Sequence, residues 1–344
     1  MNIKMPSVPN RFLRVFVTGG AGYIGSVLIP KLLGRGYKVT SYDISYYGDN
    51  FLPKSDPNLL IIRGDIRDTS KLAVSVVGHD AFISLACISN DASFELDEKL
   101  STSVNLDAFE PMVIAAKAAG VRRFIFASSS SVYGVSDEPD VTEDHPLVPL
   151  TLYNKYKGMC EPRLFKHTEA SFAGVVFRPA TVCGYAPRQR FDLSVNILTN
   201  HAVNNGKITV FGGEQMRPNL HILDYCDAVQ ALLDAPDEKV ANEIFNVGYQ
   251  NMSIMDIALL VKRVVEEEFP EKGEIGIVKT PSDDKRSYHI NSDKIKRVLG
   301  YTPKRTIEEA VRDLCRAFKD SKFTNSTADD IYFNVRRMKN LRAA

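Results

Sequence analysis

Residues 14–26 read RVFVTGGAGYIGS, a short apolar run that breaks into glycines and continues as an apolar, helix-like segment. Gly19, Gly22 and Gly25 have the spacing G-x-x-G-x-x-G, and Gly20 completes G-x-G-x-x-G with the last two. Glycines in this pattern let the backbone turn, approach a pyrophosphate and pack a helix closely against a strand. The stretch therefore predicts a strand, a tight turn and a helix whose N-terminus binds the phosphates of a dinucleotide.

A carboxylate follows the glycines at the distance expected for a ribose ligand. The apolar run at residues 38–42 predicts a second strand, and Asp43 stands at its end. An acidic residue about 20 positions after the glycines accepts hydrogen bonds from the adenosine ribose hydroxyls and repels a 2′-phosphate. The sequence therefore predicts NAD, rather than NADP, as the cofactor.

Composition excludes several classes of protein. With 43 basic and 42 acidic residues among 344, the chain has no general attraction for nucleic acid or anionic membranes. Its five cysteines are widely and irregularly spaced, which predicts neither a metal site nor a disulfide framework and favours a reducing compartment. No apolar run approaches the length of a membrane span. We therefore expect a cytoplasmic protein with no metal, nucleic-acid partner or membrane partner.

Strand-like apolar runs alternate with helical patterns along the chain. This alternation predicts an α/β fold, a Rossmann-like, doubly wound parallel sheet with a smaller α/β C-terminal cap that binds substrate. We assign residues 11–180 to the NAD-binding domain, with a return segment at about 219–250. The cap would comprise residues 181–218 and 251–320, and residues 321–344 would form a tail that is either a docked helix or mobile.

A run of serines follows one of the predicted buried strands. Residues 123–127 are apolar enough for such a strand, and residues 128–131 are all serine. Because open parallel sheets bind ligands beyond the carboxyl ends of their strands, the run indicates a site. Taken alone, it is equally well explained as a polar turn.

Tyr153 and Lys157 are four residues apart on a predicted helix, so their side chains are neighbours on one face. This arrangement suits an acid–base pair, because an adjacent ammonium and a nicotinamide cation favour the phenolate of a tyrosine whose ordinary pKa is about 10. Taken alone, such a pair is more often a surface tyrosine that covers a lysine stem.

In combination, these features resemble the extended short-chain dehydrogenase/reductase family, in its nucleotide-sugar epimerase and C4 dehydrogenase branch. The resemblance covers nearly the whole chain. It rests on the glycine motif, Asp43, Gly64-Asp65-Ile66, Leu85-Ala86, Asn105, Ser129, Tyr153, Lys157 and residues 177–184, 186–193, 217–224, 246–248 and 284–286.

The resemblance implies a role for each matching residue. Tyr153 would exchange a proton with the C4 hydroxyl of the sugar, Lys157 would hold the nicotinamide ribose and lower the tyrosine pKa, and Ser129 would bind the same sugar oxygen. The NAD ligands would be Gly19, Gly22, Tyr23, Ile24, Gly25, Asp43, Asp65, Ile66, Leu85, Ala86, Asn105, Tyr153 and Lys157. A nucleotide-diphosphate sugar would contact Ser129, Ser130, Thr181, Arg190, Arg217 and Arg286.

Other interpretations remain open for some of these residues. Arg217 or Arg286, taken alone, could equally belong to a surface ion pair, and His221 and Asn246 are expected to be structural. The resemblance also implies a homodimer built on the helix that carries Tyr153 and a helix at about residues 98–119. The apolar face of that second helix could equally pack against the sheet; it comprises Val104, Ala108, Met112 and Ala115.

Departures from the family pattern narrow the chemistry. The 4,6-dehydratases carry an acidic pair directly after the active-site hydroxyl residue, where this chain has Ser130 and Ser131. The glutamate usual in decarboxylases is absent there as well. The expected enzyme is an NAD-dependent C4 epimerase of surface-polysaccharide sugar biosynthesis, acting through a transient 4-keto sugar. A C4 dehydrogenase or reductase that releases its product, or a non-catalytic NAD-binding sensor, would also fit the sequence.

Overall fold

The computed structural model describes residues 12–136, 138, 140–282, 287 and 289–343. Its main sheet contains β1 (Arg14–Thr18), β2 (Lys38–Asp43), β3 (Leu59–Arg63), β4 (Ala81–Ser84), β5 (Arg123–Ala127), β6 (Ala173–Pro179) and β10 (Glu243–Val247). The spatial order is β10-β6-β5-β4-β1-β2-β3, and all neighbouring strands are parallel. Because the chain builds outward from β1 to both sides, the predicted doubly wound fold is confirmed.

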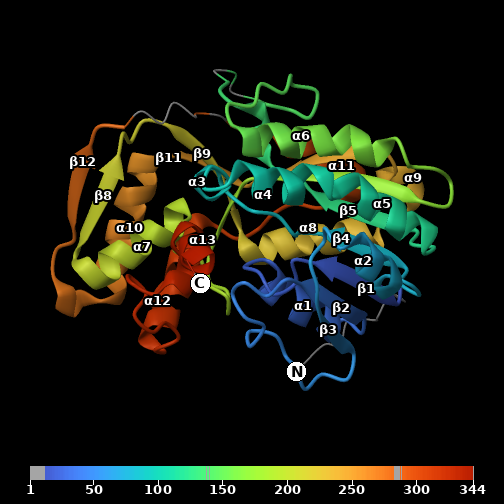
Figure 1. Cartoon of the computed structure of the whole chain (residues 1–344). Coiled ribbons are helices and arrows are strands. Elements are labelled where there is room, and N and C mark those ends of the chain that lie inside the picture. Colours follow the sequence, from blue (N-terminus) through green and yellow to red (C-terminus); the bar gives the residue numbers. More distant parts are fainter. Residues whose placement is uncertain (1–11, 137, 139, 283–286, 288, 344) are drawn as a thin grey trace, which may run out of the picture.

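Helices cover both faces of the main sheet (Figure 1), and successive residues of β1 pack into different helix layers. Val15 and Val17 pack with α1 (Gly25–Gly34) and α8 (Ile222–Asp234), whereas Phe16 faces the cluster that contains α5 (Phe109–Ala118) and α6 (Leu152–Phe165). Both faces of the sheet are therefore buried, as the near-continuous apolar strands predict. The connections carry the short helices α2 (Thr69–Ser75), α3 (Asp91–Phe94), α9 (Asp237–Val240) and a 3₁₀ turn, Ser130–Tyr133.

The helix expected at about residues 98–119 consists of three consecutive pieces. They are α4 (Glu98–Thr102), a π-helical turn (Ser103–Asp107) and α5. Ala108 and Met112, which the sequence offered to a dimer interface, are buried in the core cluster beneath α5. These two side chains therefore pack against the sheet, as the alternative interpretation of this helix predicted.

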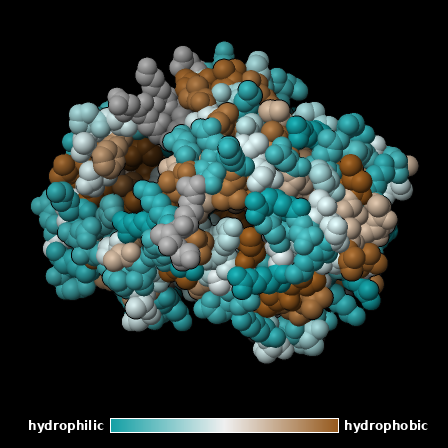
Figure 2. Space-filling model, in the orientation of Figure 1, coloured by the Kyte–Doolittle hydropathy of each residue, from teal (hydrophilic) through white to brown (hydrophobic). Residues whose placement is uncertain are grey.

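The cap has its own hydrophobic core. Two small sheets, β11-β9-β7 and β12-β8, accompany three helices around this core. The elements are β7 (Thr181–Cys183), α7 (Ser194–Asn205), β8 (Lys207–Phe211), β9 (Met216–His221), β11 (Gln250–Ser253), α10 (Ile254–Glu268), a 3₁₀ turn (Pro270–Lys272), β12 (Gly276–Thr280) and α12 (Ile307–Lys319). The face shown in Figure 2 is largely hydrophilic, and a hydrophobic recess opens in its cap half.

One segment assigned to the cap lies against the sheet domain. Ile290 and Ile295 belong to the same core cluster as Phe245 of β10, and Ile295 is carried by α11 (Asp293–Leu299). The division of the chain into two parts remains a prediction. The segment that contains α11 packs with the sheet domain and not with the cap, because the apolar side of α11 covers β10, the outer strand of the sheet.

The C-terminal segment is docked between the two parts of the molecule (Figure 1). It contains a 3₁₀ turn (Asp330–Tyr332) and α13 (Asn334–Ala343). Phe191 is fully buried, and its ring lies 5.0 Å from that of Phe323 and 5.4 Å from that of Tyr332. Of the two forms considered for the tail, the docked helix is the one observed. No helix among the described residues is long and apolar enough to cross a membrane.

Candidate active site

The glycine loop joins β1 to α1 in a conformation that side chains would prevent. Gly19 has φ of 77°, and a Cβ there would lie 2.7 Å from the backbone nitrogen of Ala86. A Cβ on Gly25 would lie 2.2 Å from the carbonyl oxygen of Gly20. Gly22 meets only the Gly19 carbonyl, at 3.2 Å, and lines a cavity. The loop therefore offers backbone N–H groups to a close-fitting ligand at the start of α1.

Asp43 ends β2 beside this loop. Its Oδ2 accepts a hydrogen bond from the Ala21 N–H at 3.0 Å, and its Oδ1 accepts one from the Ser45 N–H at 2.7 Å. Burial raises the pKa of Asp43, and these hydrogen bonds oppose that shift. The carboxylate thus fixes the glycine loop and also lines the cavity, where its remaining lone pairs face a ligand.

A cavity of about 650 Å³ extends from the glycine loop to the cap. It contains most of the residues predicted from the sequence. Those that line it are Gly19, Gly22, Tyr23, Ile24, Asp43, Asp65, Ile66, Leu85, Ala86, Ser129, Ser130, Tyr153, Lys157, Thr181, Arg190 and Arg217. A dinucleotide fits this donor set, because the open face of Gly22, the start of α1 and the Asp43 carboxylate follow one another along the wall.

Tyr153, Lys157 and Ser129 meet in this cavity from two elements. The first turn of α6 carries Tyr153, and Thr151 caps that helix by accepting the Asn154 N–H at 3.3 Å. Lys157 Nζ donates to the carbonyl of Ala127 at 2.8 Å, which fixes the ammonium at the end of β5. Ser129 Oγ accepts the Ser131 N–H at 3.2 Å. The three side chains are therefore held by separate contacts and face a shared space.

The electrostatic environment of Tyr153 is set first by the burial of its hydroxyl and then by nearby charged groups. Burial raises the pKa of Tyr153 well above its ordinary value, Cys87 and Asp91 add to the rise, and Arg190 opposes it. The lowering of this pKa that Lys157 and a nicotinamide cation would together cause stays a prediction.

Two predicted cofactor ligands do not line the cavity, and one predicted substrate ligand falls outside the description. The amide of Asn105 accepts the N–H of Ile88 and donates to its carbonyl, both at 2.9 Å, so it shapes the loop after β4. Gly25 packs beneath the glycine loop, so closely that a side chain would not fit there. Arg286 lies outside the described residues.

Buried contacts support the serine run after β5. Glu161 Oε1 accepts a hydrogen bond from Ser128 Oγ at 2.6 Å, and Glu161 Oε2 pairs with Arg178 Nη2 at the same distance. Asn246 Oδ1 accepts the Tyr133 hydroxyl at 2.7 Å. This buried network fixes the loop that presents Ser129, and it agrees with the structural role expected for Asn246.

The residues expected to bind substrate come mainly from the cap side. Thr181 lies on β7, and Arg217 on β9 donates through Nη1 to the carbonyl of Met216 at 3.0 Å. Arg190 donates through Nε to Asp192 at 2.9 Å and through Nη1 to Ser89 at 3.0 Å. Its Nη2 is buried without a hydrogen-bond partner among the described residues. Arg190 is therefore positioned rigidly and keeps one donor for a ligand.

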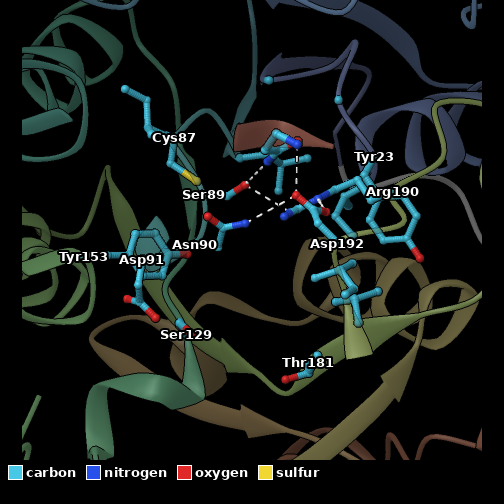
Figure 3. A pocket seen from close by; sticks show the side chains of 18 of the residues that line it. Tyr23, Cys87, Ser89, Asn90, Asp91, Ser129, Tyr153, Thr181, Arg190 and Asp192 are labelled. Carbon is cyan, nitrogen blue, oxygen red and sulfur yellow. Dashed lines mark hydrogen bonds and ion pairs between the residues drawn. The ribbon is translucent and has the colours of Figure 1, made fainter. Parts of the chain in front are cut away.

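Several residues that line the cavity were not predicted from the sequence. Figure 3 shows Tyr153, Asp91 and Ser129 on one side and Arg190 with Asp192 on the other. The loop after β4 could have been recognised, because it follows a strand whose end was expected at the crevice. The missed residues that matter here are Tyr47, Cys87, Asn90, Asp91, Arg188, Asp192, Asn334 and Met338.

Comparisons with known proteins agree with this geometry. The chain matches the NAD dependent epimerase/dehydratase family over residues 15–248. A dTDP-D-glucose 4,6-dehydratase of Mus musculus is 31% identical over 87% of this chain and 86% of that protein. The low-salt glycan biosynthesis protein Agl12 of Haloferax volcanii is 27% identical over 86% of this chain and 96% of that protein. The structure of UDP-glucose 4-epimerase with UDP-glucose from Thermotoga maritima has a TM-score of 0.79 and 25% identity, covering 90% of this chain and 99% of that one.

Fold and site together define a dinucleotide-dependent enzyme of the extended short-chain dehydrogenase/reductase class. More narrowly, the chain belongs to the NAD-dependent epimerase/dehydratase family. The prediction of NAD as cofactor is thereby confirmed, as is the prediction of an enzyme. Nucleotide-sugar chemistry follows for the family, whose members include both epimerases and dehydratases.

Proposed function

We propose that this protein is a nucleotide-sugar C4 epimerase that acts through a transient 4-keto sugar in the biosynthesis of surface-polysaccharide sugars. The observation that carries the proposal is the convergence of Tyr153, Ser129 and Lys157 on the cavity that also contains the glycine loop and Asp43. A relative that functions in glycan biosynthesis supports the proposed pathway class.

Each catalytic residue has a defined task in this reaction. Tyr153 takes the proton of the C4 hydroxyl and later returns one to the C4 oxygen. Ser129 hydrogen-bonds the same oxygen, and Lys157, held by the Ala127 carbonyl, orients the nicotinamide ribose. NAD, held by the start of α1 and Asp43, would supply the hydride acceptor and donor at C4. Return of the hydride to the opposite face of the 4-keto sugar would invert the configuration without net oxidation.

Substrate recognition is proposed for the cap side of the cavity. Arg190 and Arg217 would bind the diphosphate, because guanidinium groups match phosphate oxygens in geometry and charge. Thr181 and Ser130 would contact the sugar end. Arg286 remains part of this proposal on the basis of the sequence alone.

A 4,6-dehydratase is the second candidate, because the cavity contains a carboxylate that the sequence motif did not reveal. Ser130 and Ser131 replace the acidic pair of dehydratases, but Asp91 reaches the Tyr153 side of the cavity from the loop after β4 (Figure 3). Thr151 Oγ1 donates to Asp91 Oδ1 at 2.5 Å. A carboxyl group held there could supply the acid that elimination at C6 requires.

Proton NMR of the purified protein with a panel of nucleotide sugars, with no added cofactor, tests the proposal. A C4-inverted product without accumulated NADH is the expected result. A 4-keto-6-deoxy product would establish the dehydratase, and a keto sugar with stoichiometric NADH would establish a C4 dehydrogenase. No conversion of any sugar in a broad panel would contradict the proposed epimerase.

A homodimer packed through α5 and α6, working in the cytoplasm, completes the proposal. Ile114 on α5 and Met159 on α6 are exposed hydrophobic side chains of the kind that such a contact would bury. All five cysteines are free thiols, which suits a reducing compartment. Sedimentation analysis should give the mass of two chains, and a monomer at micromolar concentration would contradict the dimer.

A further inference from the structure

Arg188 is a buried cation with incomplete hydrogen bonding. Only 2% of its surface is exposed, and its Nε has no hydrogen-bond partner among the described residues. Its guanidinium carbon lies 3.6 Å from the centroid of the Tyr47 ring. Burial lowers the pKa of Arg188 to about 10, which shows the cost of holding this charge away from water. A buried charge of this kind is stabilised by an opposite charge.

The position of Arg188 indicates which end of the cavity it serves. Its backbone N–H donates to Ser26 Oγ at 3.3 Å, in the first turn of α1. Its side chain lines the cavity, and Asp43 and Tyr47 are among the groups whose charge acts on it. Arg188 is therefore next to the glycine loop and the ribose-binding carboxylate, at the cofactor end.

A residue of the C-terminal helix holds Arg188 in place. Asn334 is 5% exposed, and its Oδ1 accepts a hydrogen bond from Arg188 Nη2 at 2.8 Å. Its Nδ2 donates to Ser89 Oγ at 2.9 Å, and its N–H donates to Asp192 Oδ2 at 3.0 Å. One residue at the start of α13 thus joins the segment that carries Arg188 and Asp192 to the loop after β4.

The next turn of α13 bonds to the loop after β2, on the other side of the cofactor end of the cavity. Arg337 Nε donates to the carbonyl of Tyr46 at 2.8 Å, in the loop that follows β2. Met338 lines the cavity beside Asn334. The C-terminal helix therefore spans the cavity from the loop after β4 to the loop after β2.

We propose that Arg188 binds the pyrophosphate of NAD together with the start of α1, and that α13 acts as a strap that holds Arg188 and retains the cofactor. A diphosphate supplies an opposite charge in direct contact with the buried guanidinium, and guanidinium groups bind phosphate oxygens through paired N–H donors. The substrate also carries a diphosphate, but the contacts of Arg188 with Ser26 and Tyr47 place it at the cofactor end. The proposal depends on NAD binding and is independent of which C4 reaction follows.

Binding measurements on full-length Arg188→Gln test the first part. We expect NADH, followed by fluorescence, and ADP-ribose, followed by calorimetry, to bind about tenfold to a hundredfold more weakly, as for loss of a charged hydrogen bond. UDP and dTDP, which carry only the substrate-type diphosphate, should bind as to the wild type. Unchanged NADH and ADP-ribose affinity, or a loss confined to UDP and dTDP, would overturn the assignment.

Thermal unfolding with and without NAD distinguishes a role of Arg188 in NAD binding from a purely structural role. This measurement also tests the proposal if Arg188→Gln folds poorly. For Arg188→Lys, which keeps the charge but loses the fork, the rise in melting temperature caused by NAD should shrink. The melting temperature without NAD should change less. A variant with a lowered melting temperature and a full NAD-induced rise would show that Arg188 is structural only.

Asn334→Ala tests the strap, with Asn340→Ala as the matched control on the same helix. Asn340 is exposed, and its side chain donates a hydrogen bond within the C-terminal segment, to Asp330 at 2.8 Å. We expect NADH to dissociate about tenfold faster from Asn334→Ala in stopped-flow displacement, and at the wild-type rate from Asn340→Ala. Equal dissociation rates in the two variants would refute a retaining role for α13.

Discussion

At the scale of single residues, the proposed mechanism gives the hydroxyl of the partly buried Tyr153 a task that its ring cannot perform. Tyr153→Phe removes the proton carrier and keeps the ring that lines the cavity. Turnover should fall by about 10² to 10⁴, the usual contribution of general acid–base catalysis, while NADH affinity stays near the wild-type value. Steady-state kinetics and NADH titration give both quantities.

A second tyrosine on the same helix provides the control for that experiment. Tyr156 lies outside the cavity lining and packs against Phe94, with ring centroids 5.5 Å apart. Tyr156→Phe should leave turnover within about twofold, because an exposed or weakly bonded hydroxyl contributes little. Equal turnover in Tyr153→Phe and the wild type would remove Tyr153 from the mechanism.

Asp43 has two tasks, and its substitution should reveal both. Asp43→Ala removes the acceptor of the Ala21 and Ser45 N–H groups and the negative charge that disfavours a 2′-phosphate. NADH should bind at least about tenfold more weakly, and the preference for NADH over NADPH should decrease. Fluorescence titration with both nucleotides measures the ratio, and a wild-type ratio would exclude Asp43 from the ribose site.

At the scale of elements, α1 is placed by a contact between two glycines. Gly25→Ala would put a methyl group 2.2 Å from the Gly20 carbonyl, so the helix or the loop must move. We expect the free energy of unfolding to fall by about 1–3 kcal/mol, and NADH affinity to fall as well, because the phosphate-binding N–H groups shift. Urea denaturation and NADH titration measure the two effects.

Gly34→Ala is the matched change at the other end of the same helix. A Cβ at Gly34 has no atom within 4 Å, and its φ is an ordinary one. Its free energy of unfolding should stay the same or rise by up to about 1 kcal/mol, since alanine restricts the unfolded chain. If Gly25→Ala behaved in the same way, the close approach of α1 to the loop would not control the site.

At the scale of the whole molecule, alkaline pH should destabilise the fold. Burial raises the pKa of Tyr42 and Tyr133 to about 12, and it does the same for the thiols of Cys160, Cys183 and Cys226. These groups hold their protons more tightly when folded than when unfolded. Their stabilisation is complete below the unfolded pKa values and is lost as the pH rises through the window above them.

We therefore expect the free energy of unfolding to decline steadily as the pH rises from about 8.5, the thiol reference value, toward 12. Urea denaturation across that range, with tyrosine ionisation followed by absorbance, provides the measurement. A constant free energy of unfolding up to about pH 11 would mean that these buried groups open to water without global unfolding.

Much of the site could be predicted because its geometry is local. The turn between β1 and α1 requires glycines at fixed spacing, Asp43 ends the next strand, and Tyr153 and Lys157 are neighbours on one helix. Asn105 could not be interpreted in the same way. Its place in the family resemblance gave no indication that its amide would bond the backbone of Ile88, 17 residues away.

The sequence alone thus determined the fold class and the cofactor, and it placed Tyr153 and Lys157 side by side on one helix, because period and spacing fix these features within a few turns of chain. Only the tertiary structure showed that Arg188 and Asn334, 146 residues apart, meet above the cofactor end. It also decided that residues 290–301 pack on the sheet domain and that Asp91 reaches the active site. Contacts of this kind depend on how elements pack in three dimensions, and no local pattern of residues encodes them.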